Sequence, residues 1–180
     1  TITCAAGMTI DGDDSGTDSG IAAMNRSNVN VDGCTITDFY RGIRFEDVTG
    51  GSITDSTISS NLFYGIDLTR STSIIVDNNE VLESGDEGIH VSGKLANNTC
   101  PTPHTGSNTL TTNFITDTAG EGIYLLCSDG NRIKNNAFSD NAAVGINVDE
   151  TSNSNLISTN SLQNDGIQVK LSLNNTLVHN

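Results

Sequence analysis

One dipeptide, glycine followed by isoleucine, recurs along almost the whole chain at a nearly constant interval. The seven copies begin at Gly20, Gly42, Gly65, Gly88, Gly122, Gly145 and Gly166, so successive copies lie 22, 23, 23, 34, 23 and 21 residues apart. A period of this length is typical of solenoid proteins, in which each repeat stacks on its neighbours. The long interval predicts a loop insertion at about residues 94–105, a stretch that also contains both prolines.

The residues after each glycine alternate between apolar and variable, as in Ile66-Asp67-Leu68 and Ile89-His90-Val91. This alternation predicts a strand with one buried face. Two more strands are expected in each repeat, one near Val29–Val31 and one near Ile36. Three short strands in about 23 residues bury their inner faces only by stacking on identical neighbours about 4.8 Å away. The pattern therefore predicts an all-β fold, a parallel β-helix of about seven coils, right-handed because parallel crossovers almost always are.

A second column of the repeat is polar and is expected to point inward at a bend of each coil. It contains Cys34, Ser56, Asn79, Asn113, Asn136 and Asn160. Stacked amides in such a position can hydrogen-bond to one another along the solenoid axis, and loss of one would leave buried partners unpaired. We therefore expect a structural asparagine ladder rather than catalytic residues.

The repeated N-x-I-x-x-N and G-I-x-V units resemble the parallel β-helix repeat family, in the pectin lyase-like superfamily. Its members include pectinases, alginate lyases and epimerases, the periplasmic accessory protein of nitrous-oxide reductase, and phage tailspikes. The resemblance spans nearly the full chain and implies the fold. It implies no single function, because in such proteins the site is separate from the repeats.

Charge and cysteine content narrow the setting of the chain. The 180 residues include 22 acidic and 8 basic side chains, a net charge of −14. A negative surface disfavours nucleic acid and anionic lipid as partners, and no apolar stretch approaches the roughly 18 residues of a membrane span. Four cysteines permit two disulfides with three possible connectivities, as expected in an extracellular or periplasmic protein. Cys100, in the inserted loop, can fold back onto Cys127, which leaves Cys4 and Cys34 as the remaining pair. The chain opens on Thr1 and is expected to be one domain over residues 1–180 of a longer product.

The outward residues of the first strand form a column that is a candidate binding face. It contains Ala22, Arg44, Asp67, His90, Tyr124, Asn147 and Gln168, and is flanked by Arg41, Tyr64, Glu87 and Glu121. Polysaccharide lyases and C5-epimerases need a cation for the uronate carboxylate, together with a base and an acid. Arg44, His90 and either Tyr64 or Tyr124 have the required chemistry, with Asp67 orienting His90. The alternative is an ordinary solvated sheet face.

The segment Tyr64-Gly65-Ile66-Asp67 is similar to the first half of the mannuronan C5-epimerase signature Y-G-F-D-P-H-D. Leu68-Thr69-Arg70 replaces the second half, so the resemblance carries over only Tyr64 and Asp67. The missing histidine would have to come from the next coil, as His90. Arg41, Arg44 and Arg70 lie near this face and favour an acidic sugar.

Other motifs are less complete. Asp11, Asp13 and Ser15, with Asp18 nearby, match the first half of a D-x-D-x-S-G calcium loop, but the twelfth position is Ala22. The alternative is an acidic solvated turn. Asn25, Asn97 and Asn174 match the N-glycosylation pattern.

Two functional hypotheses follow. The first is a secreted β-helix that binds or processes an extracellular, acidic polysaccharide on the His90 column; as an enzyme it would be a polysaccharide lyase or C5-epimerase, with calcium as a possible cofactor. The second is a structural or adhesive solenoid such as a stalk, a tailspike-like shaft or a filament subunit. Thr1-Ile2-Thr3 and Thr176-Leu177-Val178 look like cut coils with open strand edges, which favours end-to-end self-association or additional capping domains.

Overall fold

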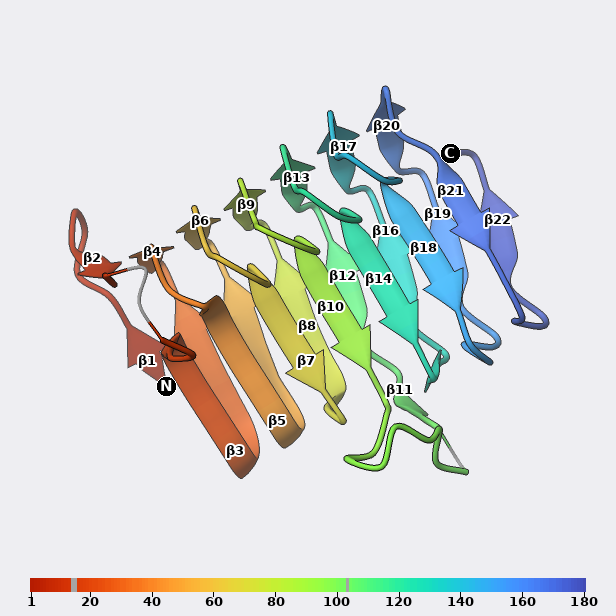
Figure 1. The fold of residues 1–180 in the computed structure, drawn as a ribbon, viewed down its shortest axis with the longest axis horizontal. Helices are drawn as coiled ribbons and strands as arrows, with labels where there is room; N and C mark the ends of the chain where they lie inside the picture. The colour runs from red at the N-terminus through yellow and green to blue at the C-terminus, as the bar shows by residue number, and fades with distance from the viewer. Residues whose placement is uncertain (14–15, 103) are drawn as a thin grey trace.

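The chain folds into a right-handed parallel β-helix, seen from the side in Figure 1. This computed structural model describes residues 1–13, 16–102 and 104–180. The described residues contain no helix, and their strands pair in parallel from coil to coil. The fold predicted from the glycine repeat is confirmed.

Three faces run the length of the solenoid. The first contains the leading halves of β3 (Ser19–Asp32) and β5 (Arg41–Thr54), then β7 (Ile66–Thr69), β10 (Ile89–Ser92), β14 (Ile123–Leu126), β18 (Ile146–Asp149) and β21 (Ile167–Val169). The second contains β1 (Ile2–Thr3), the trailing halves of β3 and β5, then β8 (Thr72–Asp77), β12 (Thr109–Thr111), β16 (Arg132–Lys134), β19 (Leu156–Ser158) and β22 (Thr176–Val178). The third contains β2 (Thr9–Asp11), β4 (Thr35–Thr37), β6 (Thr57–Ser59), β9 (Glu80–Leu82), β13 (Phe114–Thr116), β17 (Ala137–Ser139) and β20 (Ser161–Gln163).

Two strands are longer than the repeat predicts. Each of β3 and β5 has 14 residues and continues around a corner, so the first and second faces form one sheet there. The two strands pair almost throughout, from Ser19 with Arg41 to Asp32 with Thr54. Positive φ at Asp47, Gly50 and Gly51 lets β5 bend without ending. The prediction of three separate strands therefore holds only from the third coil onward.

Columns of identical apolar residues fill the interior. Ile43, Ile66, Ile89, Ile123 and Ile146 lie in register and are fully buried. The preceding glycine is required by space: a Cβ on Gly42 would lie 2.3 Å from Ile58 Cγ2 and 2.6 Å from the Gly65 carbonyl oxygen. The Gly-Ile dipeptide thus marks the point in each coil where the chain turns closely over the core.

The predicted asparagine ladder is present. The backbone N–H of each member donates to the side-chain oxygen of the next, from Cys34 and Ser56 through Asn79, Asn113, Asn136 and Asn160 to Asn180. A second ladder, missed in the sequence, runs through Asn108, Asn131, Asn155 and Asn175 at another corner. Its members lie five residues before Asn113, Asn136, Asn160 and Asn180, and the column is not polar in the earlier coils, where Val29, Gly51 and Ile74 occupy it.

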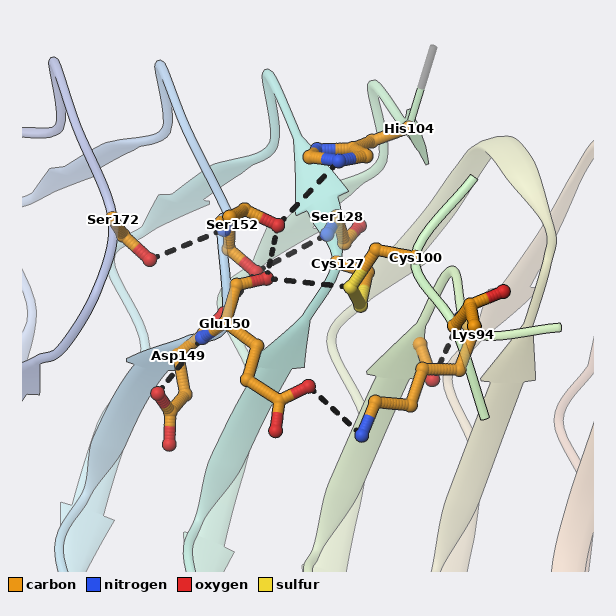
Figure 2. The surroundings of a disulfide bond; sticks show 12 residues. Lys94, Cys100, His104, Cys127, Ser128, Asp149, Glu150, Ser152 and Ser172 are labelled. Atoms are coloured by element: carbon orange, nitrogen blue, oxygen red, sulfur yellow. Dashed lines mark hydrogen bonds and ion pairs between the residues drawn. A yellow bond between two sulfur atoms is a disulfide. The ribbon is translucent and has the colours of Figure 1, made fainter. Parts of the chain in front are cut away.

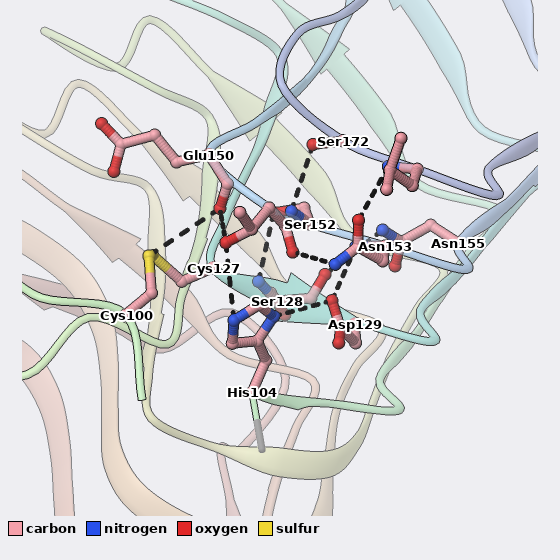
Figure 3. A network of polar contacts seen from close by, with 12 residues as sticks. Cys100, His104, Cys127, Ser128, Asp129, Glu150, Ser152, Asn153, Asn155 and Ser172 are labelled. Atoms are coloured by element: carbon pink, nitrogen blue, oxygen red, sulfur yellow. Dashed lines mark hydrogen bonds and ion pairs between the residues drawn. A yellow bond between two sulfur atoms is a disulfide. The ribbon is translucent and has the colours of Figure 1, made fainter. Parts of the chain in front are cut away.

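The insertion between β10 and β11 (Thr105–Gly106) is anchored to the next two coils. Cys100 forms a disulfide with Cys127, and Lys94 Nζ lies 2.8 Å from Glu150 Oε2, as Figure 2 shows. Figure 3 shows the polar network beyond it, in which Asp129 accepts hydrogen bonds from His104 and from the Asn153 backbone. β11 also pairs with β15 (Ser128–Asp129). The second disulfide, Cys4–Cys34, joins the first turn to the start of the ladder.

Candidate functional site

The first face of the solenoid carries the predicted outward column. The strand register places Arg44, Asp67, His90 and Tyr124 directly beside one another on β5, β7, β10 and β14. The flanking residues Arg41, Tyr64, Glu87 and Glu121 form a second column. The residue after each of the first three is a glycine, and its backbone amide donates a hydrogen bond to the carbonyl of the flanking residue in the next coil. We call these two columns together, with Arg41, the His90 face.

The His90 face is more enclosed than a solvated sheet surface. Asp67 is 2% exposed and His90 is 8% exposed. The alternative of an ordinary solvated sheet face does not describe Asp67 and His90, because Arg41 and Tyr64 of the flanking column fold over them. The column spacing was readable from the sequence; this covering layer was not.

Aromatic rings cover much of the face. Tyr40 and Phe63 stack at 5.1 Å between ring centroids, and Phe63 stacks on Tyr64 at 4.0 Å. The Tyr64 ring lies nearly parallel to the His90 imidazole at 4.3 Å, and His90 meets the edge of Tyr124 at 5.8 Å. Together the five rings form a continuous strip that runs across successive coils. Tyr40, Phe63, Tyr64 and Tyr124 are half-buried.

The arginines of the face are paired with carboxylates. Arg41 Nε lies 3.1 Å from Asp67 Oδ2, and Arg44 binds Glu46. Arg70 contacts both Glu46 and Asp47, and these hydrogen bonds raise the arginine pKa further above its usual value. The sequence argument that three arginines make the face attractive to an acidic sugar therefore loses its basis.

Asp67 has partners other than the expected one. Its Oδ1 accepts a hydrogen bond of 2.7 Å from Thr69 Oγ1, and its Oδ2 lies 3.9 Å from Arg44 Nε as well as near Arg41. The described contacts give Asp67 no hydrogen bond to His90. The carboxylate nearest the imidazole is Glu87, whose Oε2 lies 3.8 Å from His90 Nδ1.

Three carboxylates, Asp86, Glu87 and Glu121, gather beside the aromatic strip, although the sequence predicted Glu87 and Glu121 only as residues flanking the column. Glu87 is 6% exposed, while Asp86 and Glu121 are half-buried. Burial, and then the charges of Glu87 and Glu121, raise the pKa of Asp86. Burial also raises the pKa of Tyr64 and Tyr124, and nearby carboxylates add to both effects. The tyrosine hydroxyls are therefore held protonated in a negative environment.

Other predicted site residues lie away from this face. Asp11 lies on β2, the Asp18 carbonyl accepts the Arg41 amide, and Ser15 lies outside the described residues. Calcium binding there stays a prediction. Asn25, Asn97 and Asn174 are exposed, and their glycosylation also stays a prediction.

A shallow groove of about 300 Å³ lies at a different corner of the solenoid. It is lined by polar side chains and the exposed ring of Phe114. The ladder residues in its floor, Ser56 and Asn79, hydrogen-bond within the fold. The groove therefore has fewer unpaired polar groups than the His90 face.

The fold and the repeat define a parallel β-helix protein. More specifically, the chain belongs to the family described as periplasmic copper-binding protein (NosD), whose family model matches residues 5–180. The predicted extracellular or periplasmic setting is thereby narrowed to the periplasm. No helix long and apolar enough to cross a membrane occurs among the described residues. No curated protein is significantly similar to the chain in sequence.

Two solved structures are similar to the chain, and the first of them shares its fold. The periplasmic alginate epimerase AlgG superposes with a TM-score of 0.63 at 17% identity, over 89% of this chain and 47% of the epimerase. A family 28 exopolygalacturonase from Yersinia enterocolitica gives a TM-score of 0.43 at 16% identity, over 85% of this chain and 33% of that one. The chain therefore spans about half the length of the epimerase.

Proposed function

We propose that the chain binds a polysaccharide along the His90 face. The observation that carries this proposal is the strip of rings formed by Tyr40, Phe63, Tyr64, His90 and Tyr124. The rings stack on one another, so they offer a sugar their apolar edges and, in tyrosine, the hydroxyl group, which suits the mixed apolar and hydroxyl surface of a sugar. Three rungs between Arg44 and Tyr124 span about 14 Å, the length of a short run of sugar units.

Binding is favoured over lyase or epimerase chemistry by the state of the charged groups. Those reactions need a cation at the uronate carboxylate and a base at C5. Here Arg44 is paired with Glu46 and Asp67, and the raised pKa of Tyr64 and Tyr124 keeps both phenols protonated, so that neither can accept the C5 proton. In the proposed role, the exposed edges and hydroxyl groups of Tyr64 and Tyr124 contact the sugar, with half-buried Arg44 beside them, while buried His90 supports the Tyr64 ring from below.

Calorimetric titration with a panel of neutral, acidic and amino-sugar oligosaccharides tests the proposal. The Tyr64→Ala variant should weaken binding of the recognised sugar about tenfold, equivalent to about 1.4 kcal/mol. Phe114→Ala, which removes an exposed ring from another face, is the matched control and should bind as the parent does. Equal affinity in both variants would place binding elsewhere, and a panel without any binder would refute the function.

Because the family is described as copper-binding, copper is a candidate ligand of this chain. Copper is held by thiolates, thioethers and imidazoles. All four cysteines are joined in disulfides. Within the described part of the chain, the group of potential ligands that lie together is Cys100, Cys127 and Glu150, and its two sulfurs are bonded to each other, as Figure 2 shows. This group of described residues therefore does not fit a copper ion.

The alternative of a stacking solenoid is favoured by one observation. Leu171 and Leu173 in the last coil are 80% and 70% exposed, and their apolar surface is available to a further coil or a second copy. Light scattering distinguishes these cases: particles that grow with concentration support end-to-end stacking. A monomer at all concentrations would refute it for this chain.

A further inference from the structure

We propose that reduction of the Cys100–Cys127 disulfide opens a metal site, in which the two sulfurs and the Glu150 carboxylate bind one zinc ion. The three side chains come from the inserted loop, from the residue directly after β14 and from the residue directly after β18, and Figure 2 shows them together. This site is separate from the His90 face and does not depend on the proposed sugar binding.

The first support is the position of the ligand atoms. The two sulfurs and one carboxylate oxygen of Glu150 all lie within 4.8 Å of one another. Zinc holds thiolates at about 2.3 Å and carboxylate oxygens at about 2.1 Å, so ligand atoms around one tetrahedral ion lie about 3.5–4 Å apart. Small side-chain movements after cleavage of the S–S bond therefore suffice. The Cys4–Cys34 disulfide has no third ligand of this kind beside it in the described part of the chain.

The second support is that contacts other than the disulfide hold the ligands in place. The strand register puts Cys127 beside Glu150 of the next coil, and the Cys127 amide donates to the Glu150 carbonyl at 3.1 Å. The loop is anchored on both sides of Cys100, by the ion pair of Lys94 with Glu150 and by the pairing of β11 with β15. These contacts limit the movement of the three ligands in the reduced protein.

The third support is the charge and type of the ligands. Two thiolates and one carboxylate carry a charge of −3, and Lys94 beside Glu150 reduces it to −2, which a divalent cation neutralises. Sulfur ligands favour zinc over magnesium and calcium. Lys94 occupies one lone pair of the carboxylate and leaves others for the metal. The Glu150 side chain is 44% exposed, so an ion reaches the site from solvent.

The opening step is a thiol–disulfide exchange with a dithiol as the reductant. One thiolate of the dithiol attacks Cys100, which is half-buried whereas Cys127 is fully buried, and Cys127 leaves as a thiolate. The second thiol of the reductant then displaces Cys100 and closes the reductant's own disulfide, so two electrons pass to the protein. Zinc binds both sulfurs as thiolates, and the two protons of the dithiol are released to solvent.

Calorimetric titration with zinc compares the oxidised protein with protein reduced by a phosphine, and circular dichroism follows its β-sheet signal. The reduced protein should bind one ion per chain. The oxidised protein should bind at least about a hundredfold more weakly, because its sulfurs are bonded to each other. Cobalt in place of zinc should show a thiolate charge-transfer band. Zinc should also slow trypsin cleavage after Lys94 in the reduced protein.

Two variants that break the same ion pair provide the matched comparison. Glu150→Gln removes a ligand and should weaken zinc binding by about tenfold or more, whereas Lys94→Gln keeps the carboxylate and should bind zinc at least as tightly as the parent. Equal affinities in these two variants would overturn the three-ligand site.

The double variant Cys100→Ser/Cys127→Ser should bind no zinc after reduction, and the same stoichiometry as in the parent would overturn the proposal. A reduced protein that loses its β-sheet signal and does not regain it with zinc would overturn the proposal equally, because the ligands are held by the fold. Each of these outcomes leaves the proposed sugar binding standing.

Discussion

The asparagine ladder and the His90 face are both stacks of polar, mostly buried residues, with one residue supplied by each coil. In the ladder, Asn113 Nδ2 donates to the Val76 carbonyl at 3.0 Å and to Asn136 Oδ1 at 2.9 Å, and its own Oδ1 accepts from Asn79. On the face, Glu87 Oε2, His90 Nδ1 and Asn147 Oδ1 have no partner.

The difference follows from what is stacked. An amide carries both a donor and an acceptor, so a column of amides satisfies itself along the axis. A column of Arg, Asp, His and Tyr has no such complementarity, and unpaired atoms remain. The ladder is therefore expected to contribute stability, and the face to retain groups for a ligand.

The largest expected effect is in the ladder. Asn113→Ala leaves the Asn79 amide and the Val76 carbonyl without their side-chain partner, at about 1–3 kcal/mol each. We expect a loss of about 4 kcal/mol in the free energy of unfolding, measured by urea denaturation. Asn97→Ala, at an exposed amide in the insertion, should change stability by less than about 0.5 kcal/mol. Similar losses in the two variants would contradict the ladder's role.

Loss of either disulfide is expected to have the next largest effect. Cys4–Cys34 and Cys100–Cys127 close segments with sequence separations of 30 and 27, so the chain-entropy account predicts a loss of about 3–4 kcal/mol for either double serine variant. Only loss of Cys100–Cys127 should free the insertion and speed trypsin cleavage after Lys94. Equal cleavage rates in the two variants would mean that Lys94–Glu150 and the His104 contacts hold the loop alone.

A smaller effect of opposite sign is expected on the His90 face. Glu87→Gln removes a charge from a carboxylate that is 6% exposed and has one unpaired oxygen. We expect unfolding stability to be unchanged or raised by up to about 1 kcal/mol, because less desolvated charge remains. A loss above about 2 kcal/mol, by the same denaturation assay, would show that Glu87 is paired as fully as a ladder residue.

The smallest effect depends on pH. The raised pKa of Asp86 means that the folded state favours its neutral form, so this contribution to stability is present in acid and is lost as pH rises through the raised pKa. Asp86→Asn should therefore stabilise the fold at pH 7, by about 0.5 kcal/mol for a partly exposed group, and the gain should shrink toward pH 4.

Asp140 provides a control of opposite sign. Hydrogen bonds from Ser139 and Asn164 lower the pKa of its carboxyl, so its contribution is present near neutral pH and is lost as pH falls. Asp140→Asn should slightly lower the melting temperature at pH 7 and have no effect in acid. If both variants showed the same pH trend, the assignment of negative potential to the His90 face would be wrong.

The sequence alone determined the coil, the register and the ladder. These features depend on a local pattern that is repeated in every coil: a glycine where a Cβ has no room, followed by an isoleucine of the core. Counting residues from Gly42 or Gly88 therefore locates any other column, including the ladder. The positions of Arg44, Asp67, His90 and Tyr124 on one face followed from that count.

Only the tertiary structure decided how these side chains pair. Arg41 bends back to Asp67, Tyr64 covers His90, and Glu87 Oε2 is left without a donor. The first two contacts join side chains from different coils. A repeat specifies which residues are neighbours, because the backbone fixes their spacing. It does not specify which neighbour a long charged or aromatic side chain contacts, because that depends on rotamers, burial and the competition among adjacent charges.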